Sequence, residues 1–409
     1  MSLLRDRNFL LLFVGQGVSR FGDGLYTAAT AWLAWSLTKD PTAVALVSVS
    51  AFAPAFVATF VVASYADRRD RRKLMIASDL ARVAVVVVAS VLLCIDLLNL
   101  PVLVATTAIL ALIGAPFAPA RNAIVTQIVS ADRLQQANGF LQVAFRAAFF
   151  VGPLTLAPLL AYGSLQWALV INGLTFVASA GAVAAIRVTR PASTGSQSGL
   201  WSDLAAGLRA VRAAPDVLVV IVTFVLALAL TSGFLTVGLV AVVGQGGQYG
   251  LLLGVAGVAE VVGAFLLAGL RIRRLALAAV LAWAALGIFR APLGTVTSTA
   301  VAAVLLIATG LASALTDIPL IALVQQRIPS HHLAKVLGLW EAGVAGALAV
   351  SPFVASTAIA LTGVQGAFLL SGAALVFLAV TATLVLVRVG ARQSRQLSNG
   401  TADDKQYAG

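Results

Sequence analysis

Long apolar runs, separated by short polar connections, make up nearly all of this sequence. A run of about 20 apolar residues forms a helix that crosses the hydrocarbon core of a bilayer. The 409 residues are 60% hydrophobic and only 10% charged, whereas soluble domains carry about 25% charged residues. So few charges cannot cover a water-facing surface, which excludes a soluble enzyme, a disordered protein and a single-pass anchor. We predict an all-α integral membrane protein with about twelve transmembrane helices.

The basic residues of the connections gather at alternate ends of these runs. One set of connections holds most of the 27 lysines and arginines, including the cluster at 68–73, whereas the opposite set holds only Lys39 and Arg290. Lysine and arginine are enriched in cytoplasmic loops. The bias predicts a multi-pass protein of the cell membrane, with an even number of spans and both termini in the cytoplasm. It also accounts for the net charge of +12, so we expect no nucleic-acid partner.

The longest polar stretch between runs, residues 188–215, divides the chain near its middle. Its first part has the composition of a flexible linker. Its second part places Trp201, Leu204 and Leu208 at helical spacing, which predicts an amphipathic helix at the cytoplasmic membrane face.

A weak internal repeat supports a division into two halves. At a constant offset, Gly139 matches Gly338 and Pro153 matches Pro352. Parallel duplicated halves are an architecture of secondary transporters. We therefore predict two six-helix pseudo-repeats, organised as an N-terminal bundle at 1–190, a cytoplasmic linker with the amphipathic helix at 191–215, a C-terminal bundle at 216–388 and a cytoplasmic tail at 389–409.

The connection between the second and third runs carries the most informative motif, ASYADRRDRRKL at residues 63–74. It resembles the signature of the major facilitator superfamily, which reads Gly-x-Leu-Ala-Asp-Arg-x-Gly-Arg-Arg/Lys in the same connection. Four charged residues match this pattern: Asp67, Arg68, Arg71 and Arg72. Ala63 and Asp70 stand where the family often has glycine. The Asp-Arg-x-Asp-Arg-Arg form is similar to a bacterial efflux branch that includes macrolide and enterobactin exporters.

This resemblance implies the major facilitator fold and a role for the four matching residues. In the family, the aspartate and arginines form a latch between the two halves that helps to hold the outward-facing state. Asp67 is then expected to face the start of the eleventh helix, whose exposed N–H groups stabilise a carboxylate. The alternative is a stop-transfer charge cluster that merely orients the chain.

A second motif lies in the fifth apolar run, where FFVGPLTLAP occupies residues 149–158. Gly152 and Pro153 are similar to the antiporter motif of the same family, although Ala157 and Pro158 stand where its later glycines would be. A Gly-Pro pair in a membrane helix permits close packing and a bend. We therefore expect the fifth helix to bend here.

Charged residues inside the apolar runs are costly in a membrane and usually face a cavity or a partner. Arg20 and Asp23 lie three apart on one face of the first helix, where they either neutralise each other or bind substrate or protons. Arg146 either pairs with a carboxylate or meets an anionic substrate. Glu260 has no basic residue nearby on its own helix, so it must be protonated, hydrated or paired across helices. It has either a direct role in transport or a structural polar contact.

Two further sets of charges are assigned structural roles. Asp79 and Arg82 repeat the three-residue spacing in the third helix and are expected to belong to a charge network around Asp67. Asp317 and Glu341 are expected to join a second network in the other half.

The sequence contains no catalytic constellation and no nucleotide-binding loop. Cys94 is the only cysteine, and the adjacent His331 and His332 have no third ligand nearby and are expected in a connection. We therefore expect no enzyme activity, no metal and no other cofactor.

We predict a monomeric secondary active transporter that exports a hydrophobic or amphipathic small molecule by alternating access, in exchange for protons. Glu260 leads the candidates for proton coupling, followed by Asp23, while Arg20 and Arg146 are further candidates for contact with the substrate. The alternatives are a nutrient or lipid facilitator or uptake transporter, and a membrane receptor or scaffold that does not transport.

Overall fold

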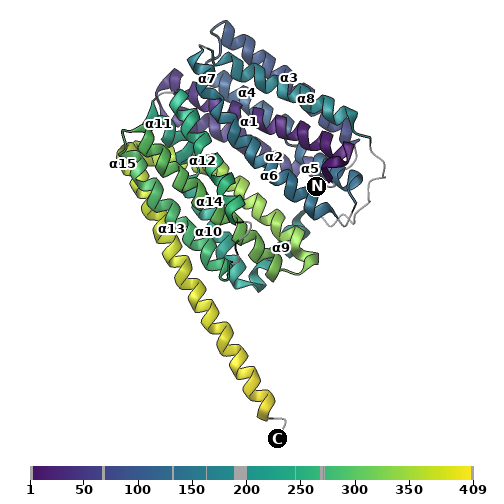
Figure 1. Ribbon diagram of the computed structural model, residues 1–409, viewed down its shortest axis with the longest axis vertical. Coiled ribbons are helices and arrows are strands. Elements are labelled where there is room, and N and C mark those ends of the chain that lie inside the picture. Colours follow the sequence, from purple (N-terminus) through teal and green to yellow (C-terminus); the bar gives the residue numbers. More distant parts are fainter. Residues whose placement is uncertain are drawn as a thin grey trace.

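Helices are the regular elements of this chain in its computed structural model (Figure 1). The structure describes residues 3–66, 70–130, 133–162, 164–187, 200–244, 246–267, 270 and 272–406. The helices before the middle of the chain, called here the first group, are α1 (Arg7–Thr38), α2 (Pro41–Ala66), α3 (Arg71–Cys94), α4 (Leu100–Gly114), α5 (Phe117–Ile128), α6 (Leu134–Leu154), α7 (Leu156–Ala161) and α8 (Gln166–Ala185).

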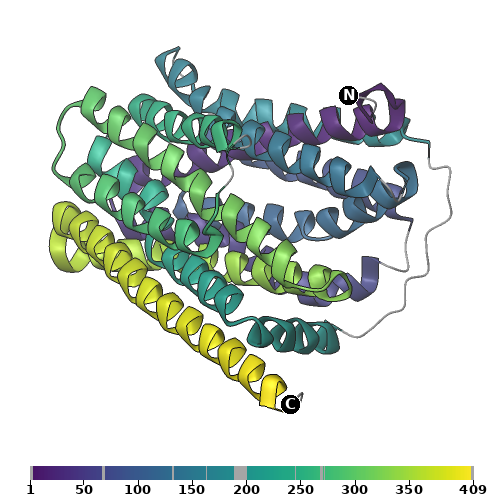
Figure 2. The ribbon, with the colours of Figure 1, turned by 60° about the horizontal axis from the view of Figure 1, so that its bottom comes forward.

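The helices after the middle of the chain form the second group. They are α9 (Leu200–Ala213), α10 (Pro215–Thr231), the π-helix η3 (Phe234–Gly238), α11 (Leu239–Val243), α12 (Gly246–Leu267), α13 (Leu275–Arg290), the 3₁₀-helix η4 (Ala291–Gly294), α14 (Thr299–Arg327) and α15 (Ser330–Gln406). Most helices run roughly along one direction (Figure 2).

Polar side chains at the ends of the apolar runs fix where several helices begin. The carboxylate oxygen Oδ1 of Asp6 accepts a hydrogen bond from the backbone N–H of Phe9 at 3.0 Å and so caps α1. Asp70 caps α3 by accepting from the backbone N–H groups of Arg72 and Lys73 at 3.1 and 3.2 Å. Such side-chain caps satisfy N–H groups that have no partner within the helix. Asp70, which departs from the family pattern, therefore starts the third helix.

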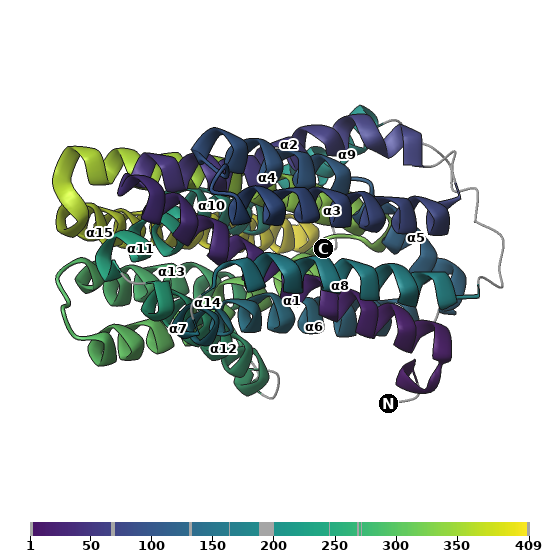
Figure 3. The same cartoon turned by 90° about the horizontal axis from the view of Figure 1, so that it is seen from above.

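Eight helical segments of the described chain are long and apolar enough to cross a membrane, judged by length and composition. The last segment covers Lys335–Ala391 within α15, and Gly363 divides it with non-helical backbone angles of φ 70° and ψ 173°. Glycine adopts this positive φ without a Cβ clash. Figure 3 shows α15 folding back on itself, and its C-terminal part continues to Gln406, where the sequence predicted a tail after 388.

The helices of each group pack mainly against one another. In the first group, α1 packs against α6 and α8, and α3 packs against α8. In the second group, α12 packs against α14, and α10 and α13 pack against α15. Contacts between the groups run from α2 to α15 and from α6 and α7 to α12.

The apolar cores of the described residues differ between the two ends of the molecule. At the end away from the basic connections, one cluster joins both groups and includes Leu25, Val44, Phe234 and Tyr249. Toward the basic end, the first group has its own cluster around Phe9, and the second group has a separate cluster around Phe224, Trp283 and Trp340. The two groups therefore share a core at one end and keep separate cores at the other.

Small residues bring α1 and α6 into close contact. A Cβ atom added to Gly24 would lie 2.0 Å from the carbonyl oxygen of Phe149, and one added to Gly152 would lie 2.4 Å from the carbonyl oxygen of Phe21. Real Cβ atoms do not approach this closely, so the crossing requires glycine at both positions. Helix α6 ends at Leu154, directly after Pro153.

We expect Gly152→Leu to destabilise the protein by about 1–3 kcal/mol, because the new side chain must push α1 away from α6. The matched control is Gly139→Leu in the same helix, where nothing lies within 4 Å of an added Cβ. Thermal unfolding of the purified variants in detergent measures the difference. Equal unfolding midpoints for the two variants would contradict the close crossing.

Candidate functional site

The first charged pair of the site lies on α1. Arg20 Nη1 and Asp23 Oδ2 are 3.6 Å apart and form the ion pair that their spacing suggests. Both side chains stay partly exposed, at 39% and 26%. The pair is therefore neutralised internally yet remains accessible.

A second charged pair is buried in α3. Arg82 Nη2 donates a hydrogen bond to Asp79 Oδ1, and the side chains are 9% and 0% exposed. The guanidinium of Arg82 lies over the rings of Phe176, at 4.3 Å from the centroid, and Phe117, at 4.8 Å. Aromatic faces attract a guanidinium, most strongly where water is excluded. Two aromatic rings and a carboxylate thus hold the charge of Arg82 inside the helix bundle.

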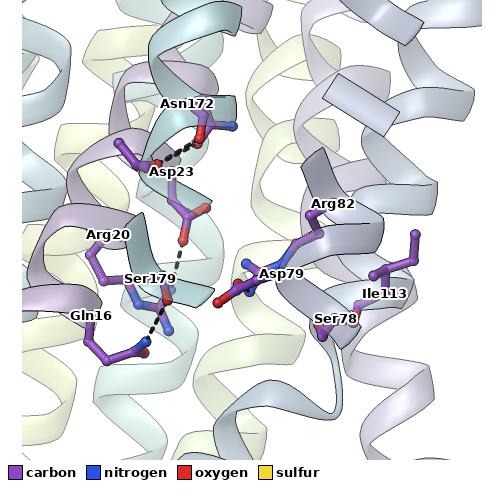
Figure 4. Close-up of polar contacts among 10 residues, drawn as sticks. Gln16, Arg20, Asp23, Ser78, Asp79, Arg82, Ile113, Asn172 and Ser179 are labelled. Carbon is purple, nitrogen blue, oxygen red and sulfur yellow. Dashed lines mark hydrogen bonds and ion pairs between the residues drawn. The ribbon is translucent and has the colours of Figure 1, made fainter. Parts of the chain in front are cut away.

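The two pairs belong to one electrostatic network among α1, α3 and α8. Figure 4 shows their side chains directed toward the space between these helices. Asp23 interacts electrostatically with Arg82, and Asp79 interacts with Asp23. Gln16 Nε2 donates to Ser179 Oγ at 3.2 Å, which ties α1 to α8 beside the network. Two carboxylates therefore share the field of one buried arginine.

The sequence placed Asp79 and Arg82 in a network around Asp67, which lies outside the described residues, so that expectation stays a prediction. The described contacts add an interaction of both residues with Asp23. Gln16 is buried between α1 and α8, at 2% exposed. The polar side chains of α1 and α8 therefore hold the network together.

Arg20 and Arg121 approach the same aromatic ring. Their guanidinium carbons lie 5.9 and 4.9 Å from the ring centroid of Phe145 on α6. Arg121 also donates to the side-chain oxygen of Asn122 and interacts electrostatically with Glu341 of the second group. Arg121 lies within α5. It brings a positive charge of the first group toward a carboxylate of the second.

Glu260 lies on α12 and interacts electrostatically with Arg290 on α13. Arg290 is buried, although the sequence counted it among the residues of the opposite connections. Its Nη1 donates to the carbonyl oxygen of Thr231 at 3.4 Å, just before the π-helix η3. This arrangement agrees with the alternative in which Glu260 is paired across helices. Through Arg290, it also links the Glu260 carboxylate to the end of α10, where the irregular helix η3 follows.

The signature residues are only partly described. Asp67 and Arg68 lie outside the described residues, and Arg71 begins α3. Arg72 donates from Nε to the carbonyl oxygen of Val183 at 3.1 Å and from Nη2 to that of Ala184. A cation at a helix C-terminus satisfies its last carbonyl groups, so Arg72 ties α3 to the end of α8.

Two further expectations concern Arg146 and the binding of a metal ion. Arg146 lies in α6, and its side chain is outside the description. The described residues contain no group of three or more side chains that could hold a metal ion.

The fold and this set of buried charges are typical of a membrane transporter, and the comparisons agree. A family profile described as transmembrane secretion effector matches residues 1–405. The chain therefore belongs to this family of major facilitator superfamily transporters, and it is not an enzyme. A comparison with curated protein sequences finds no match.

Solved transporters share the fold at low sequence identity. A variant of the nucleoside transporter NupG has a TM-score of 0.73 and 13% identity, covering 92% of this chain and 99% of that one. A bacterial homologue of the human lysosomal transporter Spinster, in an inward-facing and unoccupied conformation, has 0.69 and 12%, covering 94% and 96%. The human organic anion transporter MFSD10 has 0.66 and 17%, covering 93% and 99%.

We expect Arg82→Met to lower the free energy of unfolding by about 3–5 kcal/mol, because it leaves the fully buried Asp79 carboxylate without its partner. Combining it with Asp79→Asn should recover much of this loss. Thermal or denaturant unfolding of both single variants and the double variant measures the coupling. Strictly additive losses would show that the two side chains do not depend on each other.

Proposed function

We propose that this chain is a secondary active transporter that exports a hydrophobic or amphipathic small molecule in exchange for protons. In this proposal it is a monomer in the cell membrane, with the basic end and both termini in the cytoplasm. In this proposal the chain has twelve spans. The eight apolar segments give nine of them, because Gly363 divides the last segment into two. The other three are α1, α2, and α6 together with α7.

The positions of the apolar cores at the two ends of the molecule are the main support for a transporter that works by alternating access. Alternating access requires two bodies that meet at one membrane face and separate at the other. The shared core at one end and the separate cores at the basic end fit a state that opens toward the cytoplasm. We propose that residues 1–190 rock against 216–388, joined by the linker at 191–215, with 389–409 as the tail.

Export is the direction that we propose. The description of the family as a secretion effector supports outward movement. The resemblance of the 63–74 motif to bacterial efflux transporters points the same way. By their match to that motif, Asp67, Arg68, Arg71 and Arg72 stay a predicted latch, and in this role they would stabilise the outward-facing state.

An amphipathic substrate suits the side chains around Arg20 and Arg121. The two guanidinium carbons lie 5.9 and 4.9 Å from the centre of the Phe145 ring, so an apolar group is next to two positive charges. Glu341 supplies the opposite charge from the second group. A molecule with an apolar body and a polar end can contact both kinds of surface.

Proton coupling is assigned to carboxylates inside the helix bundles. Accepting a proton removes a charge whose burial is costly, so the two protonation states favour different surroundings. Glu260 on α12 interacts electrostatically with Arg290 on α13, and Asp23 and Asp79 both interact with Arg82 in the first group. Either carboxylate can therefore link its protonation to the packing of several helices.

We expect Glu260→Gln to abolish the dependence of transport on a pH gradient, because glutamine mimics the protonated form permanently. The assay is flux into or out of proteoliposomes with and without a pH gradient, using lipophilic cations, macrolides and siderophores. Asp23→Asn is the second variant. Asp96→Asn is the control, because Asp96 is exposed in a connection and its φ of 55° suits asparagine.

The outcomes separate the alternatives. If Glu260→Gln keeps full pH-driven flux while Asp23→Asn loses it, the network of the first group carries the protons. If both variants keep it, proton exchange through these sites is wrong and a facilitator is the better description. Gradient-driven accumulation in the opposite direction would favour uptake, and the absence of flux for the whole panel would favour a scaffold or receptor.

A further inference from the structure

A pocket outside the charged network lies beside α9 at the basic end of the molecule. Its volume is about 480 Å³. Most of its described lining is apolar and comes from α9, the residue after it, and the connection between α14 and α15: Ala206, Ala210, Ala213, Ala214, Ile328 and Pro329. The other described lining residues are Arg209, Arg327 and His332, so none of the described lining residues is acidic.

The two arginines of the pocket differ in how they are held. Arg327 Nε lies 2.9 Å from Asp216 Oδ2, an ion pair that fixes the direction of its side chain. Arg209 is exposed, and its Nε donates a long hydrogen bond of 3.4 Å to the carbonyl oxygen of Ala205 in its own helix. A guanidinium retains several N–H donors beyond one such bond. The pocket therefore offers strong donors beside a wall of small apolar groups.

Close packing holds α9 in place beside this pocket. A Cβ atom added to Gly207 would lie 2.8 Å from the carbonyl oxygen of Lys335, so α9 contacts the start of α15 at backbone distance. Val211 is 1% exposed in the core of the second group. The sequence placed His332 in a connection, whereas it lies in the first turn of α15 and lines the pocket. Three separate elements thus form one preorganised site.

We propose that this pocket binds the phosphate group of an acidic ligand, with Arg209 and Arg327 as its donors. Guanidinium groups match phosphate oxygens in geometry and charge. If the basic end faces the cytoplasm, the pocket lies at the level of the phospholipid headgroups of that leaflet, which basic pockets bind. The phosphate can come from an acidic phospholipid or from a free phosphate in the cytoplasm, and the small apolar wall has room for the glycerol part of a lipid.

The test titrates the purified full-length protein in neutral detergent and follows its Tm. The probes are short-chain phosphatidylglycerol, short-chain phosphatidylcholine and inorganic phosphate. We expect phosphatidylglycerol to raise the Tm in a saturable manner, because a ligand that binds the folded state stabilises it. Phosphatidylcholine, which carries no net charge, should act more weakly.

Two variants of the same helix distinguish a site from general surface attraction. Arg209→Gln should weaken the apparent affinity about fivefold, the contribution of one basic residue at a membrane surface. Arg212→Gln removes the same charge from an exposed position outside the pocket and should leave the affinity unchanged. Ala210→Leu fills the pocket without changing any charge and should also weaken binding.

The titration with inorganic phosphate distinguishes the two sources of the phosphate group, a free phosphate and a lipid headgroup. Saturable stabilisation by phosphate that Arg209→Gln weakens supports a free phosphate ligand, whereas a response confined to phosphatidylglycerol supports the lipid headgroup. The proposal is overturned if neither probe saturates, if Arg209→Gln and Arg212→Gln weaken binding equally, or if Ala210→Leu has no effect. These readouts do not use transport, so they are independent of the proposed function.

Discussion

A charge inside a membrane must meet an opposite charge, an aromatic face or water, and the helices of this protein are arranged to satisfy that requirement. The buried pair of Asp79 and Arg82 is the centre of the first group, because its partners come from α1, α5 and α8. Moving any of these helices exposes or separates a charge. The packing of the first group therefore depends on this pair in addition to its apolar contacts.

The second constraint is close helix packing through small residues. Gly24 and Gly152 place α1 against α6, and Gly257 brings α12 against Phe150 of the first group. Contacts of this kind join the two groups along α6 and α12, while the shared core closes the end away from the basic connections. The charges of Arg121 and Glu341 lie on different groups, so their interaction energy changes when the groups move. The two groups are thus joined by close helix contacts and by an electrostatic interaction whose energy depends on their relative position.

Much of this architecture can be predicted from the sequence, because hydropathy and charge are local properties. The runs of apolar residues indicate membrane helices, the three-residue spacing of Arg20 and Asp23 indicates a pair, and the 63–74 motif indicates the family. The partners of buried charges depend on contacts between helices distant in the chain. The approach of Arg290 to Glu260, and of Arg82 to Phe176, is therefore visible only in three dimensions.

The central claim is that the two groups of helices move against each other between two membrane faces. Distances between paired spin labels test it directly, with one pair at Thr126 and Gln326 toward the basic end and another at Asp40 and Thr295 at the opposite end, all at exposed positions. The account predicts that protonating conditions or substrate shift the two distance distributions in opposite directions, one shortening as the other lengthens. Distributions that stay unchanged under every condition, or that change together, would contradict alternating access.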